Sequence, residues 1–241
     1  MLFAIATAPA AWLAWGVARF TDSRVLLDAP RGSVWQGQAT LVLQGRHIPP
    51  QSLGDLGWRI DPFGLVTGRL PVSVRATDAG RRLQANVELH LDRIILRDVD
   101  VELPAEMAPL AYSPALFLHL GGELRLVAAA LELQHGTVTG QVELQWQSAT
   151  TGLSKVKPLG DYRLYLKGDG ARATLKLETP RGALLLVGDG QWDLASGRLD
   201  FNGLARPLAH AADLEPLLQL FGRDQGGGQR YFMMSTRVLM Y

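Results

Sequence analysis

Much of this chain alternates between apolar and polar residues with a period of two. The clearest segment has apolar Leu83, Ala85, Val87, Leu89 and Leu91 alternating with polar Gln84, Asn86, Glu88 and His90. Because successive side chains of a β-strand point to opposite faces, this pattern predicts a strand with one buried face. The same alternation occurs at residues 33–43, 98–103, 138–146, 162–167, 174–178 and 199–202. The sequence therefore predicts a mainly β protein.

Glycine and proline turn motifs separate these segments, among them Gly168-Asp169-Gly170 and Gly188-Asp189-Gly190. Such turns are typical of hairpins. Connections too short to hold a helix force neighbouring strands to run antiparallel. We therefore expect one curved antiparallel sheet, a meander that folds over on itself or partly closes.

Few segments have a helical pattern after the first twenty residues. Helical turns are expected at residues 51–56 and 105–112, and a short helix at residues 211–221. In that helix, Leu214, Leu217, Leu218 and Phe221 share one face, and Gly222 provides a stop signal. Its expected role is packing against the sheet.

The first eighteen residues carry no charged side chain. The bulky residues expected to form a membrane anchor are Leu2, Phe3, Ile5, Trp12, Leu13 and Trp15. As a helix these residues would span about 27 Å, slightly less than the roughly 30 Å hydrocarbon core of a bilayer. Three interpretations compete: a membrane anchor, a cleaved signal peptide, and a buried or interfacial helix.

The position of Pro9 and the charge pattern distinguish these interpretations. No basic segment precedes the apolar run, although a signal peptide normally begins with one. Pro9 fits the first turn of a helix better than its middle. We therefore expect residues 1–8 to end a membrane helix and residues 9–20 to form an interfacial helix. No linker divides the rest, so residues 1–20 are expected as a partial transmembrane or interfacial helix and residues 21–241 as one β-rich domain.

Charge and composition exclude several function classes. The chain has 24 Lys and Arg against 23 Asp and Glu, so no strongly basic surface is expected and nucleic acid is not an expected partner. It has no cysteine, which excludes disulfides and thiolate metal sites.

The sequence offers poor candidates for catalysis. None of the common nucleophile, phosphate-loop or zinc-helix motifs occurs. The five histidines, at positions 47, 90, 119, 135 and 210, are scattered. Asp98, Asp100 and Glu102 share a predicted strand face, but a spacing of about 6.6 Å is too wide to hold one ion without loop ligands. We expect no catalytic, metal-binding or cofactor-binding residue and no enzymatic activity.

The long apolar sheet face admits two interpretations. It can be a sealed core, which is the ordinary role of such a face, or an open groove for acyl chains. The pattern favours a sealed core and leaves the groove as the alternative.

Several short motifs, in this order along the chain, resemble the type II secretion system protein N family. They are Pro9–Leu13, Gly32–Gly37, Leu56–Arg59 with Pro62 and Gly68, Gly140–Trp146, Pro158–Tyr162, Gly188–Trp192, Gly197–Gly203, and Leu217-Leu218 before Gly222-Arg223. The residues of these motifs expected to have structural roles are Trp35, Gly37, Trp58, Trp146, Gly160, Gly190, Trp192 and Gly203.

The resemblance implies a bacterial inner-membrane protein with one spanning helix and a β-rich periplasmic domain. It implies a non-catalytic accessory role in type II protein secretion, with other inner-membrane components of that machinery and the lipid bilayer as partners. The chain departs from the family pattern at its start, where charged cytoplasmic residues and half of the spanning helix are absent, so charge does not establish its orientation. The alternative is a protein at the inner membrane that binds a lipid or another hydrophobic ligand in a groove.

Overall fold

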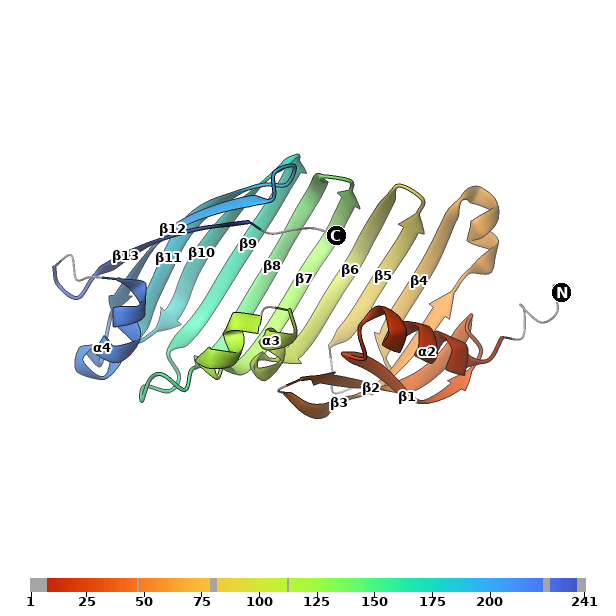
Figure 1. Cartoon of the computed structure of the whole chain (residues 1–241), viewed down its shortest axis with the longest axis horizontal. Helices are drawn as coiled ribbons and strands as arrows, with labels where there is room; N and C mark the ends of the chain where they lie inside the picture. The colour runs from red at the N-terminus through yellow and green to blue at the C-terminus, as the bar shows by residue number, and fades with distance from the viewer. Residues whose placement is uncertain (1–7, 47, 79–81, 112, 223–225, 238–241) are drawn as a thin grey trace. The chain divides into compact units, whose positions relative to one another are not determined.

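The computed structural model describes residues 8–46, 48–78, 82–111, 113–222 and 226–237. The chain divides into two compact units, residues 1–103 and 104–241. In each unit, every strand pairs with its neighbours in the sequence, and the pairs are antiparallel (Figure 1).

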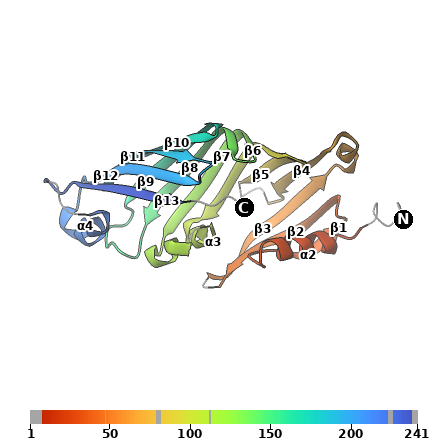
Figure 2. The ribbon, with the colours of Figure 1, turned by 45° about the horizontal axis from the view of Figure 1, so that its top comes forward.

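Unit 1 is a meander covered at its start by helix α2 (Ala10–Phe20). Its strands are β1 (Val25–Gly32), β2 (Gln36–Gly45), β3 (Ile48–Ile60), β4 (Arg69–Ala76), β5 (Leu83–His90) and β6 (Arg93–Pro104). A 3-10 helix, η1 (Pro62–Thr67), connects β3 to β4. Figure 2 shows α2 lying along β1 and β2.

Unit 2 is a second meander of longer strands. They are β7 (Gly121–Gln134), β8 (Thr137–Thr150), β9 (Gly160–Gly170), β10 (Arg172–Gly182), β11 (Leu184–Asp193), β12 (Arg198–Pro207) and β13 (Arg230–Arg237). Before them lie η2 (Ala105–Met107), α3 (Ala108–Ala111) and η3 (Ser113–Leu118), and α4 (Ala211–Leu218) with η4 (Gln219–Phe221) lies between β12 and β13.

The main fold predictions are confirmed. The protein is mainly β, its strands are antiparallel meanders, and a helix occupies the start of the described chain. The predicted helical segments at 105–112 and 211–221 coincide with η2 and α3 and with α4 and η4.

Three local predictions are wrong. Residues 51–56 belong to β3, because pairing with β2 outweighs the poor strand propensity of Gly54 and Asp55. Gly188-Asp189-Gly190 is not a turn but lies inside β11, paired with both β10 and β12. The predicted strand at residues 33–43 begins only at Gln36, because Val34 and Trp35 form the bend between β1 and β2.

The buried side chains lie on the apolar faces that alternation predicts. In unit 1 the buried residues include Leu41, Leu43, Leu56, Trp58 and Ile60 from β2 and β3. In unit 2 the buried cluster joins Leu214, Leu217 and Leu218 of α4 to Ala149, Leu159, Tyr162, Leu184 and Ala205. The helix at residues 211–221 therefore packs on the sheet as expected.

Candidate functional site

Helix α2 is apolar on its outer side as well as on the side that packs on β1. Ala10 is buried, but Trp12, Trp15 and Phe20 are 64%, 72% and 93% exposed. Arg19 is its only charged residue. Tryptophan and arginine are side chains that favour the headgroup level of a bilayer. The outer face of α2 is therefore a candidate membrane-contact surface.

The anchor residues predicted from sequence fall into two groups. Leu2, Phe3 and Ile5 lie outside the described residues. Trp12 and Trp15 lie on the exposed side of α2, whereas Leu13 is half-buried. Within the described ranges, no helix combines the length and the apolar composition needed to cross a bilayer.

Two of the expected structural residues in unit 1 contact each other across β2 and β3. Gly37 pairs with Trp58, and a Cβ at Gly37 would lie 2.9 Å from Trp58 Cε2. Trp58 Nε1 donates to the carbonyl oxygen of Val34 at 3.0 Å, and the Trp35 carbonyl accepts from Ile60 N at 2.7 Å. The glycine thus makes room for the buried ring, and Trp35 helps to fix the bend before β2.

Trp146 and Gly160 belong to the end of unit 2 that α4 covers. Trp146 packs on Tyr162 with ring centroids 5.7 Å apart and donates from Nε1 to the Gly121 carbonyl at 3.0 Å. Gly160 pairs with Gly182, and a Cβ at Gly160 would lie 2.6 Å from the Arg181 carbonyl oxygen. Trp146 and Gly160 thus lie in close packing contacts between neighbouring strands at this end of unit 2.

Gly190 and Gly203 make room for aromatic rings on neighbouring strands. A Cβ at Gly190 would lie 2.6 Å from Phe201 Cδ2, and one at Gly203 would lie 2.6 Å from Phe232 Cε1. Trp192 shares the same sheet face, and its buried Nε1 has no hydrogen-bond partner within the part of the chain that the structure describes. Gly190, Gly203 and Trp192 therefore lie on the apolar face of unit 2.

That apolar face remains partly open beyond α4. Register places Leu126, Leu144, Leu164 and Leu177 in one row across β7 to β10. Leu126 is 38% exposed, and the other three leucines are half-buried. The fully buried cluster lies where α4 packs. The face is therefore sealed at the α4 end, where Leu177 also packs against the cluster, and it becomes more accessible along the leucine row toward Leu126.

Strand β13 forms the free edge of unit 2, because it pairs only with β12 among the described strands. Tyr231 and Met233 are 62% and 83% exposed. They line a groove of about 700 Å³ with Val187, Leu204 and residues of β10 and β11. This groove lies on the sheet face opposite α4.

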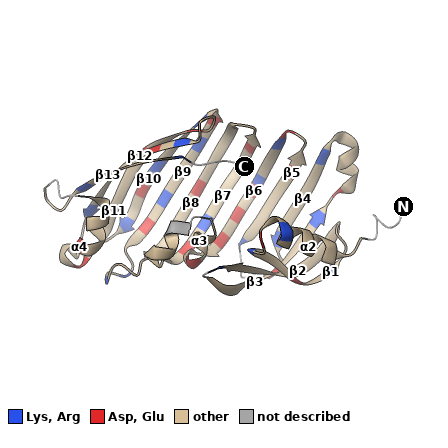
Figure 3. Ribbon diagram, viewed as in Figure 1, with Lys and Arg blue, Asp and Glu red and all other residues tan. Residues whose placement is uncertain are grey.

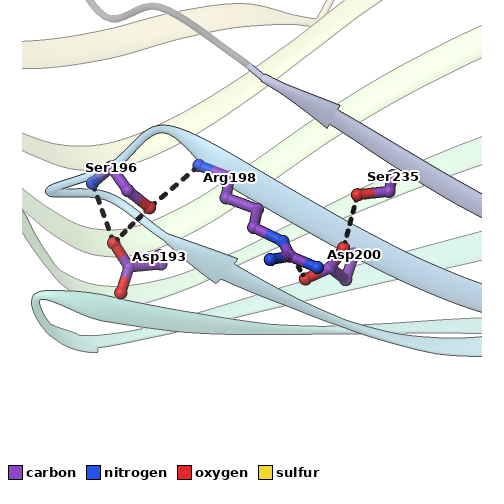
Figure 4. Close-up of polar contacts among 5 residues, drawn as sticks. All are labelled: Asp193, Ser196, Arg198, Asp200 and Ser235. Carbon is purple, nitrogen blue, oxygen red and sulfur yellow. Dashed lines mark hydrogen bonds and ion pairs between the residues drawn. The ribbon is translucent and has the colours of Figure 1, made fainter.

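Polar contacts hold β13 and the neighbouring turn in place (Figure 4). Asp200 Oδ1 accepts from Ser235 Oγ at 2.6 Å, and Arg198 Nε lies 2.8 Å from Asp200 Oδ2. The hydrogen bond from Ser235 and then the contact with Arg198 lower the pKa of Asp200. At the turn between β11 and β12, Asp193 accepts from the backbone and hydroxyl of Ser196, and both bonds lower the pKa of Asp193.

Asp161 is the carboxylate with the most extensive contacts near the α4 end. Burial opposes ionisation of Asp161, but a 2.8 Å hydrogen bond from Ser148 N and the contact with Arg181 outweigh it and lower the pKa of Asp161. Burial raises the pKa of the neighbouring Tyr162, which donates from its hydroxyl to the Leu184 carbonyl at 3.0 Å. These contacts connect β9 to β8, β10 and β11 rather than converge on a shared ligand.

Carboxylates and histidines do not gather into a metal-binding cluster in the described ranges. Asp98 accepts from Asn86, and Glu102 lies 3.6 Å from Arg82, so these two carboxylates serve different partners. Figure 3 shows acidic and basic residues interspersed along the strands of each unit. The candidate functional surfaces are therefore apolar: the outer face of α2, the leucine row and the β13 edge.

Sequence reasoning found α2 but missed the β13 surface. The segment Tyr231-Phe232-Met233-Met234 is a continuous apolar run without alternation, so no face could be assigned. The length of this apolar run and its position shortly after Gly226-Gly227-Gly228 were the features of the sequence that could have indicated an exposed last strand.

The fold and these surfaces define a class of antiparallel β-sheet proteins with an apolar leading helix and exposed apolar surfaces. The family model for type II secretion system (T2SS) protein N matches residues 23–232, and the chain belongs to this family. The family connects it to type II secretion, to protein transport and to interaction with other components of the secretion machinery. No curated protein and no solved structure matches the chain significantly.

Proposed function

We propose that this protein is a non-catalytic accessory component of the type II secretion machinery, anchored at the inner membrane. Its β units lie in the periplasm and act through protein–protein contacts. Family membership supports the secretion role. The observation that carries the membrane part is the exposure of three large aromatic side chains on α2, those of Trp12, Trp15 and Phe20.

Strand β1 of unit 1 and strand β13 of unit 2 each pair with one neighbour among the described strands, and they differ in how well they could accept a partner strand. Strand β1 contains Pro30 and an irregular register between Asp28 and Arg31, and α2 packs against it. Proline and bulges are features that protect an edge from pairing. Strand β13 has no proline and pairs with β12 in unbroken register. It is therefore the better site for strand addition by a partner.

Exposed apolar side chains add to the case for β13. A partner strand beside β13 would bring its side chains over Tyr231, Met233 and the adjoining groove. Main-chain hydrogen bonds would supply affinity, and the groove would supply specificity.

Affinity purification from detergent-solubilised membranes of a secreting strain tests this assignment. Met233→Lys should reduce the co-purified amount of a known inner-membrane secretion component about tenfold, the effect of losing an interface contact worth about 1.4 kcal/mol. Leu208→Lys is the matched control, because Leu208 is 53% exposed and lies outside β13. Unchanged co-purification with Met233→Lys would contradict a role for β13.

A lipid-binding groove is the second candidate function. The half-exposed leucine row favours it, because an accessible apolar face of this kind can accommodate an acyl chain. Native mass spectrometry of protein extracted in mild detergent separates the two candidates. One bound lipid of constant mass would favour the groove, and lipid-free protein that retains its secretion partner would favour the scaffold.

A further inference from the structure

Two adjacent turns of unit 1 gather large exposed apolar side chains at one end of the sheet. Phe63, Leu65 and Val66 of η1 are 81%, 57% and 87% exposed, and Leu91 between β5 and β6 is 98% exposed. The pairs Arg69↔His90 and Leu70↔Leu89 place the two turns side by side (Figure 1). Single exposed apolar residues are ordinary, but a group marks a contact surface. We call these four residues the tip patch.

The η1 turn that carries most of the tip patch is tightly built. Asp61 Oδ1 accepts from Phe63 N at 3.0 Å, and Thr67 Oγ1 donates to the Gly64 carbonyl at 2.9 Å. Gly64 is buried, and a Cβ there would lie 2.6 Å from Pro71 Cδ. Gly64 thus packs against Pro71 inside the η1 turn, and the large side chains of Phe63, Leu65 and Val66 are exposed to solvent.

The tip patch lies at the end of unit 1 where the chain enters α2. Ala8 O accepts from Val34 N at 2.9 Å, and the next residue, Trp35, accepts from Ile60 N at 2.7 Å. Ile60 ends β3 immediately before η1. Residues 1–7, which precede this point, contain no charged side chain. Ala8, the first residue that the structure describes, and the tip patch therefore belong to the same end of unit 1.

Two features near the tip patch suit a lipid partner. Exposed Arg69 begins β4 directly after the η1 turn, and Trp12 is exposed in the first turn of α2. Arginine can reach phosphate groups while its stem lies on apolar surface, and tryptophan favours the same depth.

We propose that the tip patch enters the interfacial layer of a phospholipid bilayer, which gives unit 1 a second membrane contact besides α2. This inference rests on the proposed membrane location. Two separate contacts fix the orientation of unit 1 on the bilayer, because one helix alone leaves the unit free to pivot.

Single labelled cysteines test the proposal in the full chain, which has no native cysteine. An environment-sensitive fluorophore is attached to each of four variants, Leu65→Cys, Leu91→Cys, Trp15→Cys and Thr174→Cys. Each labelled protein is mixed with vesicles of phosphatidylethanolamine and phosphatidylglycerol. The fluorescence emission of the labels at positions 65 and 91 should shift to shorter wavelength with vesicles, and that of the label at exposed position 174 should not. An emission shift at position 15 without shifts at positions 65 and 91 would overturn the tip-patch proposal but would remain consistent with the proposed function. No shift at any position contradicts both.

A side-chain substitution provides a second readout. Phe63→Ser together with Val66→Ser should reduce partitioning onto these vesicles at least about tenfold, from the lost apolar burial. Phe117→Ser is the matched control, because Phe117 is 74% exposed in unit 2, and it should leave partitioning unchanged. Equal partitioning of both variants and the parent protein would overturn the proposal.

Discussion

Several glycines in the strands make room for an aromatic ring on the neighbouring strand. Gly37 accommodates Trp58, Gly190 accommodates Phe201 and Gly203 accommodates Phe232. A glycine inside a strand costs backbone entropy, and the packed ring compensates by burying apolar area. The recurring glycines of the sheets are therefore packing positions.

Gly37→Ala should destabilise the protein by about 2 kcal/mol, because the new Cβ would lie 2.5 Å from the Arg31 carbonyl oxygen and 2.9 Å from Trp58 Cε2. Gly16→Ala in α2 is the control, since a Cβ at Gly16 would have no neighbouring atom within 4 Å. It should stabilise α2 by about 0.5 to 1 kcal/mol. Urea unfolding measures both, and equal stability of Gly37→Ala and the parent would contradict the packing role.

Asp161→Asn should lower stability by about 1 to 2 kcal/mol at pH 7, because it removes the charge that Ser148 N and Arg181 stabilise. The folded pKa lies below the unfolded value of about 3.9, so this stabilisation is present above that value and is lost as pH falls through the folded pKa. The difference from the parent should therefore narrow below pH about 4. Urea unfolding across this range would refute the assignment if the difference stayed constant.

At the scale of elements, the sequence predicts the strands and helices that have a clear hydrophobic period. It does not predict features that depend on contacts with neighbouring strands. The alternation at residues 83–91 and the apolar face of residues 211–221 correspond to β5 and α4. Gly188 and Gly190 of β11 were predicted to form a turn. They lie inside the strand because the ring of Phe201, on the neighbouring strand, fills the space beside them, and local pattern does not show this contact. The exposed surface of β13 was missed because Tyr231–Met234 is apolar without alternation, so the pattern assigns neither face of this strand to solvent.

Helix α4 should contribute strongly to the stability of unit 2. Leu218→Ala should cost about 3 kcal/mol, because Leu218 is fully buried in the cluster with Leu184 and Ala205. Leu220→Ala is the matched control at 63% exposure and should change stability by less than about 0.5 kcal/mol. Comparable urea midpoints for the two variants would show that α4 does not pack as described.

At the scale of the whole molecule, short connections explain why the strand order could be predicted. Turns such as Gly168-Asp169-Gly170 leave no room for a crossover, so sequence neighbours must pair. The division into two units could not be predicted, because the boundary at Leu103 and Pro104 has no glycine- or serine-rich linker to mark it.

We assign different tasks to the two units. Unit 1 carries the apolar surfaces suited to a bilayer, on α2 and the tip patch. Unit 2 carries the open strand edge and groove suited to a protein partner.

Photo-crosslinking in growing, secreting cells tests this assignment most directly. A photoreactive amino acid is placed at position 15 or at position 233, one at a time, and adducts are identified from fractionated cells. We predict a membrane-fraction protein with a phospholipid adduct at 15, and an adduct to an inner-membrane component of the type II secretion machinery at 233. Protein recovered in the soluble fraction, with no secretion-component adduct at 233, would contradict the account.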